Sequence, residues 1–93
     1  MLNIFKPKVK RHKNGFLYAK VKRKHCFKWG GYGVCDFCNQ DFKEGYLVFV
    51  LNSCICPTCY NQSTIQEHEI DPEDDKFQKE CAKDWYDYHF KNL

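Results

Sequence analysis

The 93-residue chain has no long hydrophobic run, and no stretch reaches the roughly 20 apolar residues that a membrane-spanning helix needs. Residues 1–10 also lack the apolar core of a secretory signal. We therefore expect a cytoplasmic protein whose thiols stay reduced. In that compartment the seven cysteines, an odd number, favour metal ligands over a closed set of disulfides.

Acidic residues are missing from the start of the chain, where the first one is Asp36. Residues 1–29 carry ten of the fifteen Lys and Arg, whereas residues 61–93 carry nine of the twelve acids. The formal net charge of +3 therefore hides a basic beginning and an acidic end, which attract different partners. Hydrophobic residues make up 43% of the chain, which is the composition of a folded domain. A domain this short needs additional stabilisation, such as a bound metal, to supplement its small core.

Turn signals predict that residues 1–29 form a basic β-hairpin. Asn14-Gly15 tolerates the positive φ of tight hairpin turns and separates two arms, at residues 4–12 and 16–24. In the second arm apolar and polar residues alternate, as in a strand with one covered face. Pro7 limits the first arm to a short or edge strand.

The sequence predicts a zinc finger over residues 30–68, in which residues 46–51 form an apolar strand and 60–68 a short helix. Residues 69–93 then form an acidic amphipathic helix. With the hairpin, these parts make one small α+β domain that spans residues 1–93.

The C-terminal helix has a clear start signal, because Asp71 can cap it and Pro72 suits its first position. The acids that follow lie favourably near its positive end. Its predicted core-facing stripe recurs at helical spacing and comprises Phe77, Cys81, Trp85 and Tyr88.

Two Cys-x2-Cys pairs carry the strongest chemical signal. Cys35-Asp36-Phe37-Cys38 and Cys56-Pro57-Thr58-Cys59 are separated by seventeen residues, a spacing typical of four-cysteine zinc sites. Each pair can curl into a knuckle that presents two sulfurs to one ion. We therefore predict one structural Zn2+ held by Cys35, Cys38, Cys56 and Cys59, with no open coordination position.

The other cysteines and the histidines leave alternatives open. Cys54 lies two residues before Cys56 and is either a core residue or an alternative ligand. His25-Cys26 is a weaker pair for a second site, because neighbours in a strand point to opposite faces. Cys26 and Cys81 are otherwise expected to be buried small side chains. The remaining histidines are expected to pack or to lie on the surface, and these are His12, His68 and His89.

Residues 32–68 resemble treble-clef and LIM-like zinc fingers. The resemblance rests on Cys35-x2-Cys38, a hairpin that contains Gly45, and Cys56-x2-Cys59 opening a helix. The chain departs from a LIM module, because the third ligand position is not a histidine and there is no second zinc unit. The stretch 35–60 is also similar to small zinc proteins of phages and mobile elements. That similarity implies a host bacterial cytosol and, by analogy of size, an anti-CRISPR type of inhibitor.

Known catalytic motifs do not fit the sequence. A zinc deaminase needs His-x-Glu ahead of its cysteine pair, whereas His68-Glu69 follows the cysteines. The second cysteine pair lacks the βαβ context of a thioredoxin-like redox motif. The glycine-rich stretch 29–33 precedes a knuckle and not the helix that a phosphate loop requires. We therefore expect a protein that acts by binding, with no enzyme activity, small-molecule substrate or membrane contact.

Two kinds of partner fit the charge pattern, and we favour a protein. Acidic and aromatic residues near the C-terminus would dock on a basic surface, such as the nucleic-acid channel of a Cas9-type nuclease, as a phage-encoded inhibitor would. The candidates for this surface are Glu73, Asp74, Asp75, Trp85 and Tyr86. The alternative is a nucleic-acid-binding zinc finger whose basic hairpin contacts phosphates and stacks on bases. The candidates for that role are Lys20, Lys22, Arg23, Lys24 and Trp29.

Overall fold

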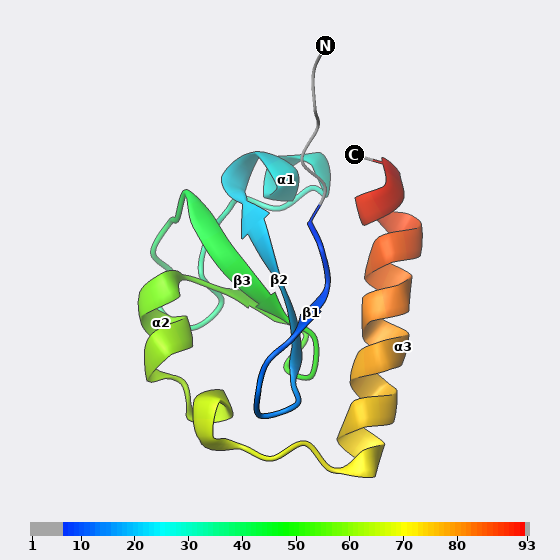
Figure 1. The fold of residues 1–93 in the computed structure, drawn as a ribbon. Helices are drawn as coiled ribbons and strands as arrows, with labels where there is room; N and C mark the ends of the chain where they lie inside the picture. The colour runs from blue at the N-terminus through cyan, green and yellow to red at the C-terminus, as the bar shows by residue number, and fades with distance from the viewer. Residues whose placement is uncertain (1–6, 93) are drawn as a thin grey trace.

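The computed structural model describes residues 7–92, which form a four-stranded antiparallel sheet with helices on either side (Figure 1). The strands lie in chain order and comprise β1 (Lys10–Arg11), β2 (Leu17–Lys22), β3 (Glu44–Val48) and β4 (Ser53–Ile55). The helices are α1 (Arg23–Lys28), α2 (Pro57–Gln62) and α3 (Pro72–Tyr88), with 3-10 turns at Thr64–Glu67 and Phe90–Asn92. The predicted small α+β class with a C-terminal helix is confirmed.

The predicted N-terminal hairpin is present but shorter than expected. Gly15 takes a φ of 101° in the turn, and Lys10 pairs with Tyr18 across the hairpin. The first six residues of the predicted hairpin lie outside the described residues. In the part that the structure describes, β1 contains two residues, and β2 pairs with β3 from Tyr18 to Lys22.

Helix α1 replaces residues 23 and 24 of the predicted second arm. The backbone N–H of Lys22 donates to Nδ1 of His25 at 3.1 Å, which closes the first turn of α1. The N–H of Arg23 donates to the carbonyl oxygen of Lys43 at 2.9 Å. Because the chain bends away from the sheet at this point, His25 and Cys26 lie on a helix and not on a strand, and both are buried.

The predicted strand at residues 46–51 is wrong at its far end. Strand β3 ends at Val48, and the chain turns through residues 49–52 into β4. Phe49 leaves the strand and is fully buried in the core, while Asn52 takes a φ of 48°. A tight hairpin therefore stands where the apolar sequence predicted one continuous strand.

The two faces of the sheet carry different side chains. Ala19 lies opposite Leu47 in the β2–β3 register, and α3 packs on their face. Lys20 lies opposite Tyr46 at the next register position, so both point to the other face. There Tyr60 of α2 stacks on Tyr46 with the ring centroids 3.8 Å apart. Among the described residues, helix α2 covers the β3 side of this face, and no helix lies over the β1–β2 side (Figure 1).

Helix α3 begins as predicted, since the side chain of Asp71 accepts a hydrogen bond from the N–H of Asp74 at 2.8 Å. The predicted apolar stripe is wrong at both ends, because Phe77 is 50% exposed and Tyr88 is 73% exposed. The buried side of the helix runs instead through Gln78, which is fully buried. A polar residue therefore occupies the centre of the contact between α3 and the sheet.

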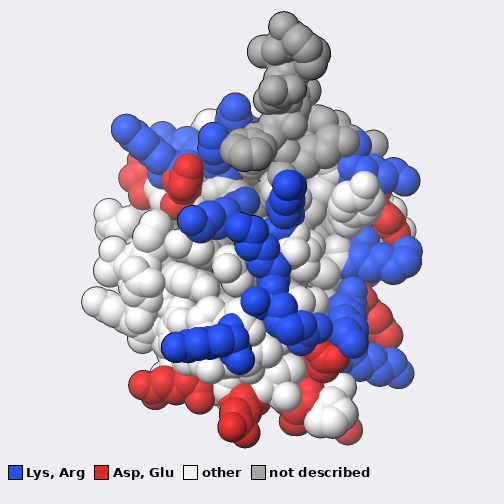
Figure 2. Space-filling view, in the orientation of Figure 1, with Lys and Arg blue, Asp and Glu red and all other residues white. Residues whose placement is uncertain are grey.

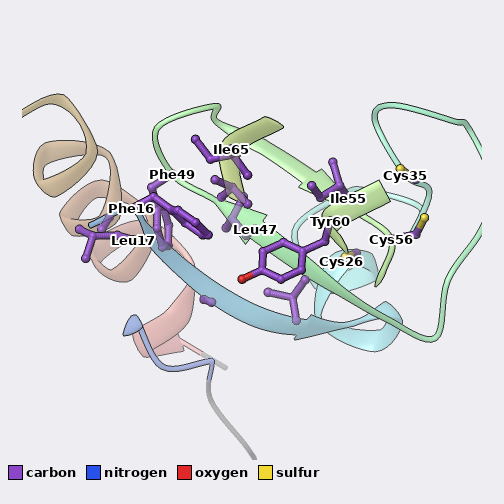
Figure 3. Packing of buried hydrophobic residues seen from close by; sticks show 14 of the residues in the cluster. Phe16, Leu17, Cys26, Cys35, Leu47, Phe49, Ile55, Cys56, Tyr60 and Ile65 are labelled. Carbon is purple, nitrogen blue, oxygen red and sulfur yellow. The ribbon is translucent and has the colours of Figure 1, made fainter. Parts of the chain in front are cut away.

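The core fills the space around β2 and β3 and reaches the edge where the cysteine pairs begin (Figure 3). Phe16, Phe49 and Ile55 are fully buried in it. At the α1 end of the molecule, the ring of Trp29 meets that of Trp85 edge to face with centroids 5.1 Å apart. This aromatic contact ties the end of α1 to α3.

Candidate metal centre

The first Cys-x2-Cys pair forms a tight turn around the sulfur of Cys35. The backbone N–H groups of Phe37 and Cys38 donate to this sulfur at 3.3 Å and 3.5 Å. The N–H of Asn39 closes the turn by donating to the carbonyl oxygen of Cys35 at 2.9 Å, and Asn39 takes a φ of 63°. Amide groups aimed at a sulfur stabilise the thiolate, which is the form that binds metal.

The second pair opens α2 and repeats this arrangement. Cys56 is the N-cap residue of α2, and its sulfur accepts a hydrogen bond from the N–H of Cys59 at 3.4 Å. Pro57 occupies the first helical position, where its missing N–H costs nothing. The positive end of the helix therefore lies beside the Cys56 sulfur.

The backbone of β4 holds the two knuckles together. The N–H of Asp36 donates to the carbonyl oxygen of Cys54 at 2.9 Å, and the N–H of Cys54 donates to the Asp36 carboxylate at 2.8 Å. Cys54 leads directly into the second knuckle. This reciprocal pair of hydrogen bonds ties the first knuckle to the strand that leads into the second.

The sulfurs of Cys35, Cys38, Cys56 and Cys59 all lie within 4.8 Å of one another. The sulfurs of Cys38 and Cys56 are 3.8 Å apart. A tetrahedral zinc ion with Zn–S bonds of about 2.3 Å requires sulfur–sulfur edges of about 3.8 Å, so the cluster fits zinc. The predicted cofactor, one zinc ion on four cysteines, agrees with this geometry. Figure 3 shows the Cys35 and Cys56 sulfurs at the edge of the core.

The four clustered thiols have shifted pKa values. Burial disfavours the thiolate of Cys35, but N–H groups of the two knuckles outweigh it and lower the pKa of this thiol to about 6. Burial, reinforced by the neighbouring sulfurs of Cys38 and Cys56, raises the pKa of Cys59 to about 12. Four sulfurs this close cannot all be ionised without a cation, and a dication removes that conflict.

The open question about Cys54 is answered by its position. It lies opposite Leu47 in the β3–β4 register and is not among the four clustered sulfurs. The neighbouring Cys26 sulfur, together with burial, raises the pKa of the Cys54 thiol well above its usual range. Cys81 is half-buried on α3, where its thiol lies 3.6 Å from the side-chain oxygen of Asn52.

Among the predicted partner-binding residues, Asp75 is engaged within the fold. Its carboxylate lies 3.0 Å from the guanidinium of Arg11 and 2.9 Å from the ammonium of Lys79. The Lys79 ammonium, with contributions from Gln78 and Arg11, holds the pKa of this carboxyl well below its usual range. The Asp75 side chain therefore links α3 to β1.

The other four predicted partner-binding residues do not gather in one patch. Trp85 is half-buried against Trp29, and Asp74 lies 3.5 Å from the ring of His68. Glu73 is exposed, and Tyr86 is 49% exposed. Their role in binding a partner stays a prediction.

Some of the residues predicted to bind nucleic acid are exposed, and others are engaged within the fold. Lys20 is exposed, with its ammonium 5.8 Å from the ring centre of Tyr46, and Lys24 is exposed on α1. Arg23 is engaged, because its guanidinium lies 3.0 Å from the carboxylate of Asp41. Lys22 lines a groove beside Lys20, whereas Trp29 packs in the aromatic contact with α3.

Two exposed lysines that we did not predict for the site, Lys8 and Lys10, line the same groove as Lys20. Lys10 lies opposite Tyr18 in the β1–β2 register, which places it on the same face as Lys20. The alternation of Lys8 and Lys10 along the first arm is the sequence signal that could have identified them.

The chain matches no protein-family profile, no curated protein and no solved structure. Within residues 7–92, none of the helices combines the length and the apolar character that a membrane span requires. We therefore infer the function of the chain from the geometry of the molecule.

Proposed function

We propose that this protein is a non-enzymatic binding module, held together by one structural zinc ion, that binds nucleic acid through an exposed lysine face. We define the lysine face as Lys8, Lys10 and Lys20. The observation that carries the proposal is their position side by side along one groove of about 180 Å³ on the open side of the sheet. We therefore favour nucleic acid over the protein partner that the sequence favoured.

The lysine face carries charge that the fold does not neutralise. Within residues 7–92, none of its three lysines forms an ion pair with an acid, whereas Arg11 and Arg23 each pair with an aspartate. Glu44 is the one acid in the wall of the groove. Figure 2 shows Lys and Arg gathered in a band over β1 and β2, with Asp and Glu toward the rim. A band of unneutralised ammonium groups attracts a chain of phosphates.

The acidic residues of α3 present less net negative charge to a partner than their number suggests. Helix α3 neutralises part of its own charge, because Lys79 pairs with Asp75 and Lys83 pairs with Asp87. These pairs lower the negative potential that mimicry of DNA requires.

The zinc ion has a structural role in this proposal. Four thiolates fill a tetrahedral site, so no coordination position remains for a water molecule or a substrate. The knuckles connect β2 and α1 to β3 and β4, and one ion therefore fixes both halves of the sheet. This donor set supports a scaffold and not a catalyst.

Binding of labelled RNA, single-stranded DNA and duplex DNA by fluorescence anisotropy, over a series of salt concentrations, tests the proposal. The variant Lys8→Gln/Lys10→Gln/Lys20→Gln should weaken binding of all sequences alike. Losing three phosphate contacts should also flatten the slope of log K against log salt by about 2 for single strands and about 3 for duplex DNA.

The matched control is Lys28→Gln/Lys43→Gln/Lys76→Gln, which removes the same charge from exposed positions outside the groove. If the effect depended on net charge alone, the affinity for nucleic acid would fall equally in both variants. An equal loss of affinity in the two triple variants would overturn the proposal. So would a wild-type protein that binds neither DNA nor RNA at low salt.

A protein partner is the second candidate, and the exposed aromatic side chains of α3 favour it. Phe77 and Tyr88 are 50% and 73% exposed on the outer side of this helix. Exposed aromatics are frequent interface residues. An inhibitor of a Cas9-type nuclease is one form of this proposal.

A pull-down from bacterial lysate, split into nuclease-treated and untreated halves, separates the two candidates. A stoichiometric protein that survives nuclease treatment and is lost on Phe77→Ala/Tyr88→Ala supports the second candidate. Partners that disappear with the nucleic acid support the first.

A further inference from the structure

A tyrosine lies among the ammonium groups of the lysine face. Tyr18 is directly opposite Lys10 in the β1–β2 register, and Lys20 follows it two positions later on β2. Since side chains at these positions point to the same side of a sheet, the ring of Tyr18 shares a face with both lysines. In the part of the chain that the structure describes, no helix lies over this area of the sheet (Figure 1). The lysine face therefore combines cations with an aromatic ring.

The ring of Tyr18 is covered less completely than its neighbours. The ring of Tyr60 lies flat on that of Tyr46, with 8° between the planes. Tyr18 instead meets these two rings at a tilt, with interplanar angles of 51° to Tyr46 and 46° to Tyr60. Phe16 contacts it at 55°. Within residues 7–92, none of the rings that contact Tyr18 is stacked on it, and the residue is only partly buried. Its ring can therefore take a stacking partner from a ligand.

Trp29, the aromatic residue that the sequence predicted for nucleic-acid binding, is engaged elsewhere. Its ring centroid lies 5.1 Å from that of Trp85 and 5.5 Å from that of Phe90. These contacts hold Trp29 between α1 and the end of α3. Tyr18 is the better placed ring for a base that is bound along the lysine face.

We propose that the lysine face selects single-stranded nucleic acid, because a base of the strand stacks on Tyr18 while Lys10 and Lys20 contact phosphates on either side of that base. This inference rests on the proposed function and names the form of nucleic acid that the face takes. In a duplex the bases are paired and stacked on one another, so none is available to a ring on a sheet surface. A single strand can turn its bases outward, and stacking on an aromatic ring tolerates any sequence.

Two strands that differ only in their bases test the inference. A labelled DNA strand of mixed sequence and an abasic strand of the same length carry the same phosphates, so the difference in affinity measures what the bases add. Fluorescence anisotropy with the zinc-loaded wild type should show that the strand with bases binds between about 5-fold and about 150-fold more tightly, as expected for one stacked base. An RNA strand of the same sequence should bind with the same dependence on Tyr18.

Variants at Tyr18 separate stacking from charge. Tyr18→Leu should bind the strand with bases as weakly as the abasic strand, whereas Tyr18→Phe keeps the ring and should retain the preference. Neither variant should change the slope of log K against log salt or the affinity for duplex DNA, because no ammonium group is lost. Tyr32→Leu is the matched control, since it removes a ring that is 78% exposed beside Trp29 and away from the lysine face.

Photocrosslinking of the wild type decides the question even if Tyr18→Leu fails to fold. A single strand that carries iodouracil is irradiated in complex with the zinc-loaded protein, and digestion with trypsin places Tyr18 in the peptide 14–20. An adduct on Tyr18 supports the inference, and adducts confined to other residues would overturn it.

The affinities also distinguish this inference from the proposed function. If the wild type bound abasic strands and strands with bases equally, phosphate contacts alone would account for binding, so the role of Tyr18 would be refuted and the proposed function would stand. A wild type that binds no nucleic acid would overturn both.

Discussion

The side-chain oxygen of Gln78 accepts a hydrogen bond of 2.7 Å from the backbone N–H of Leu17, so helix α3 is joined to strand β2 through a buried amide. The nitrogen of the same amide donates to the carbonyl oxygen of Gly15 at 2.9 Å. One side chain therefore satisfies a donor and an acceptor of the hairpin backbone where the strand pairing ends. Buried polar groups are tolerated when they are paired in this way.

Replacing Gln78 with Leu should destabilise the fold by about 1–3 kcal/mol, because it leaves the buried N–H of Leu17 without a partner, whereas the carbonyl oxygen of Gly15 keeps the guanidinium of Arg11 as a donor. Urea unfolding of the zinc-loaded protein measures this loss. Lys76→Leu is the control, since Lys76 is exposed on the same helix. Equal stability of the two variants would show that the amide contacts do not hold α3 on the sheet.

Replacing Cys38 with Ser should abolish most of the folded structure at neutral pH. The binding free energy of a structural zinc ion is largely folding free energy, and three sulfurs bind the ion far more weakly than four. Circular dichroism and zinc content measure the effect, and Cys59→Ser should behave alike. Cys81→Ser, which lies outside the cluster, should keep both its fold and its zinc. A Cys38→Ser protein that remains folded and metal-loaded would mean that the ligand set is wrong.

Asp75 should make stability depend on pH. Its pKa in the folded protein lies below the unfolded value of about 3.9, so its contribution is complete above that value and declines as the pH falls through the folded pKa. Asp75→Asn should lower the melting temperature by a few degrees at pH 7, and the difference from wild type should shrink as the pH falls below about 4. The exposed Asp84→Asn variant is the control. A difference that stays constant down to strongly acidic pH would contradict this account.

Gly45 should not tolerate a side chain. A Cβ atom at this position in β3 would lie 2.8 Å from the carbonyl oxygen of Ile55 and 2.9 Å from the ring of Phe42. Since a backbone oxygen of a paired strand cannot easily move away, Gly45→Ala should cost about 1–3 kcal/mol. Gly31→Ala is the comparison, because its Cβ would meet nothing closer than 3.4 Å. Thermal unfolding of the two zinc-loaded variants should show the larger loss for Gly45→Ala, and the reverse order would refute the steric argument.

The sequence was most informative where one residue type has a strict local role. The spacing of Cys35, Cys38, Cys56 and Cys59 predicted a cluster that the fold brings together. Asp71 and Pro72 predicted the start of α3, and Asn14-Gly15 predicted the hairpin turn. Each of these signals depends on the geometry of a few neighbouring residues.

Signals that depend on distant contacts were misleading. Residues 46–51 read as one strand because apolar residues continue into the turn, where Phe49 leaves the strand and is buried in the core. Gln78 could not be placed in the core by periodicity, since its partners are hairpin backbone groups that the helix sequence does not specify.

The central claim is a zinc ion held by four sulfurs. Zinc-edge X-ray absorption of the purified protein, together with its metal content, tests that claim most directly. The account predicts one zinc per chain with four sulfur neighbours at about 2.3 Å. A shell that contains nitrogen or oxygen, or a folded protein that binds no zinc, would contradict it.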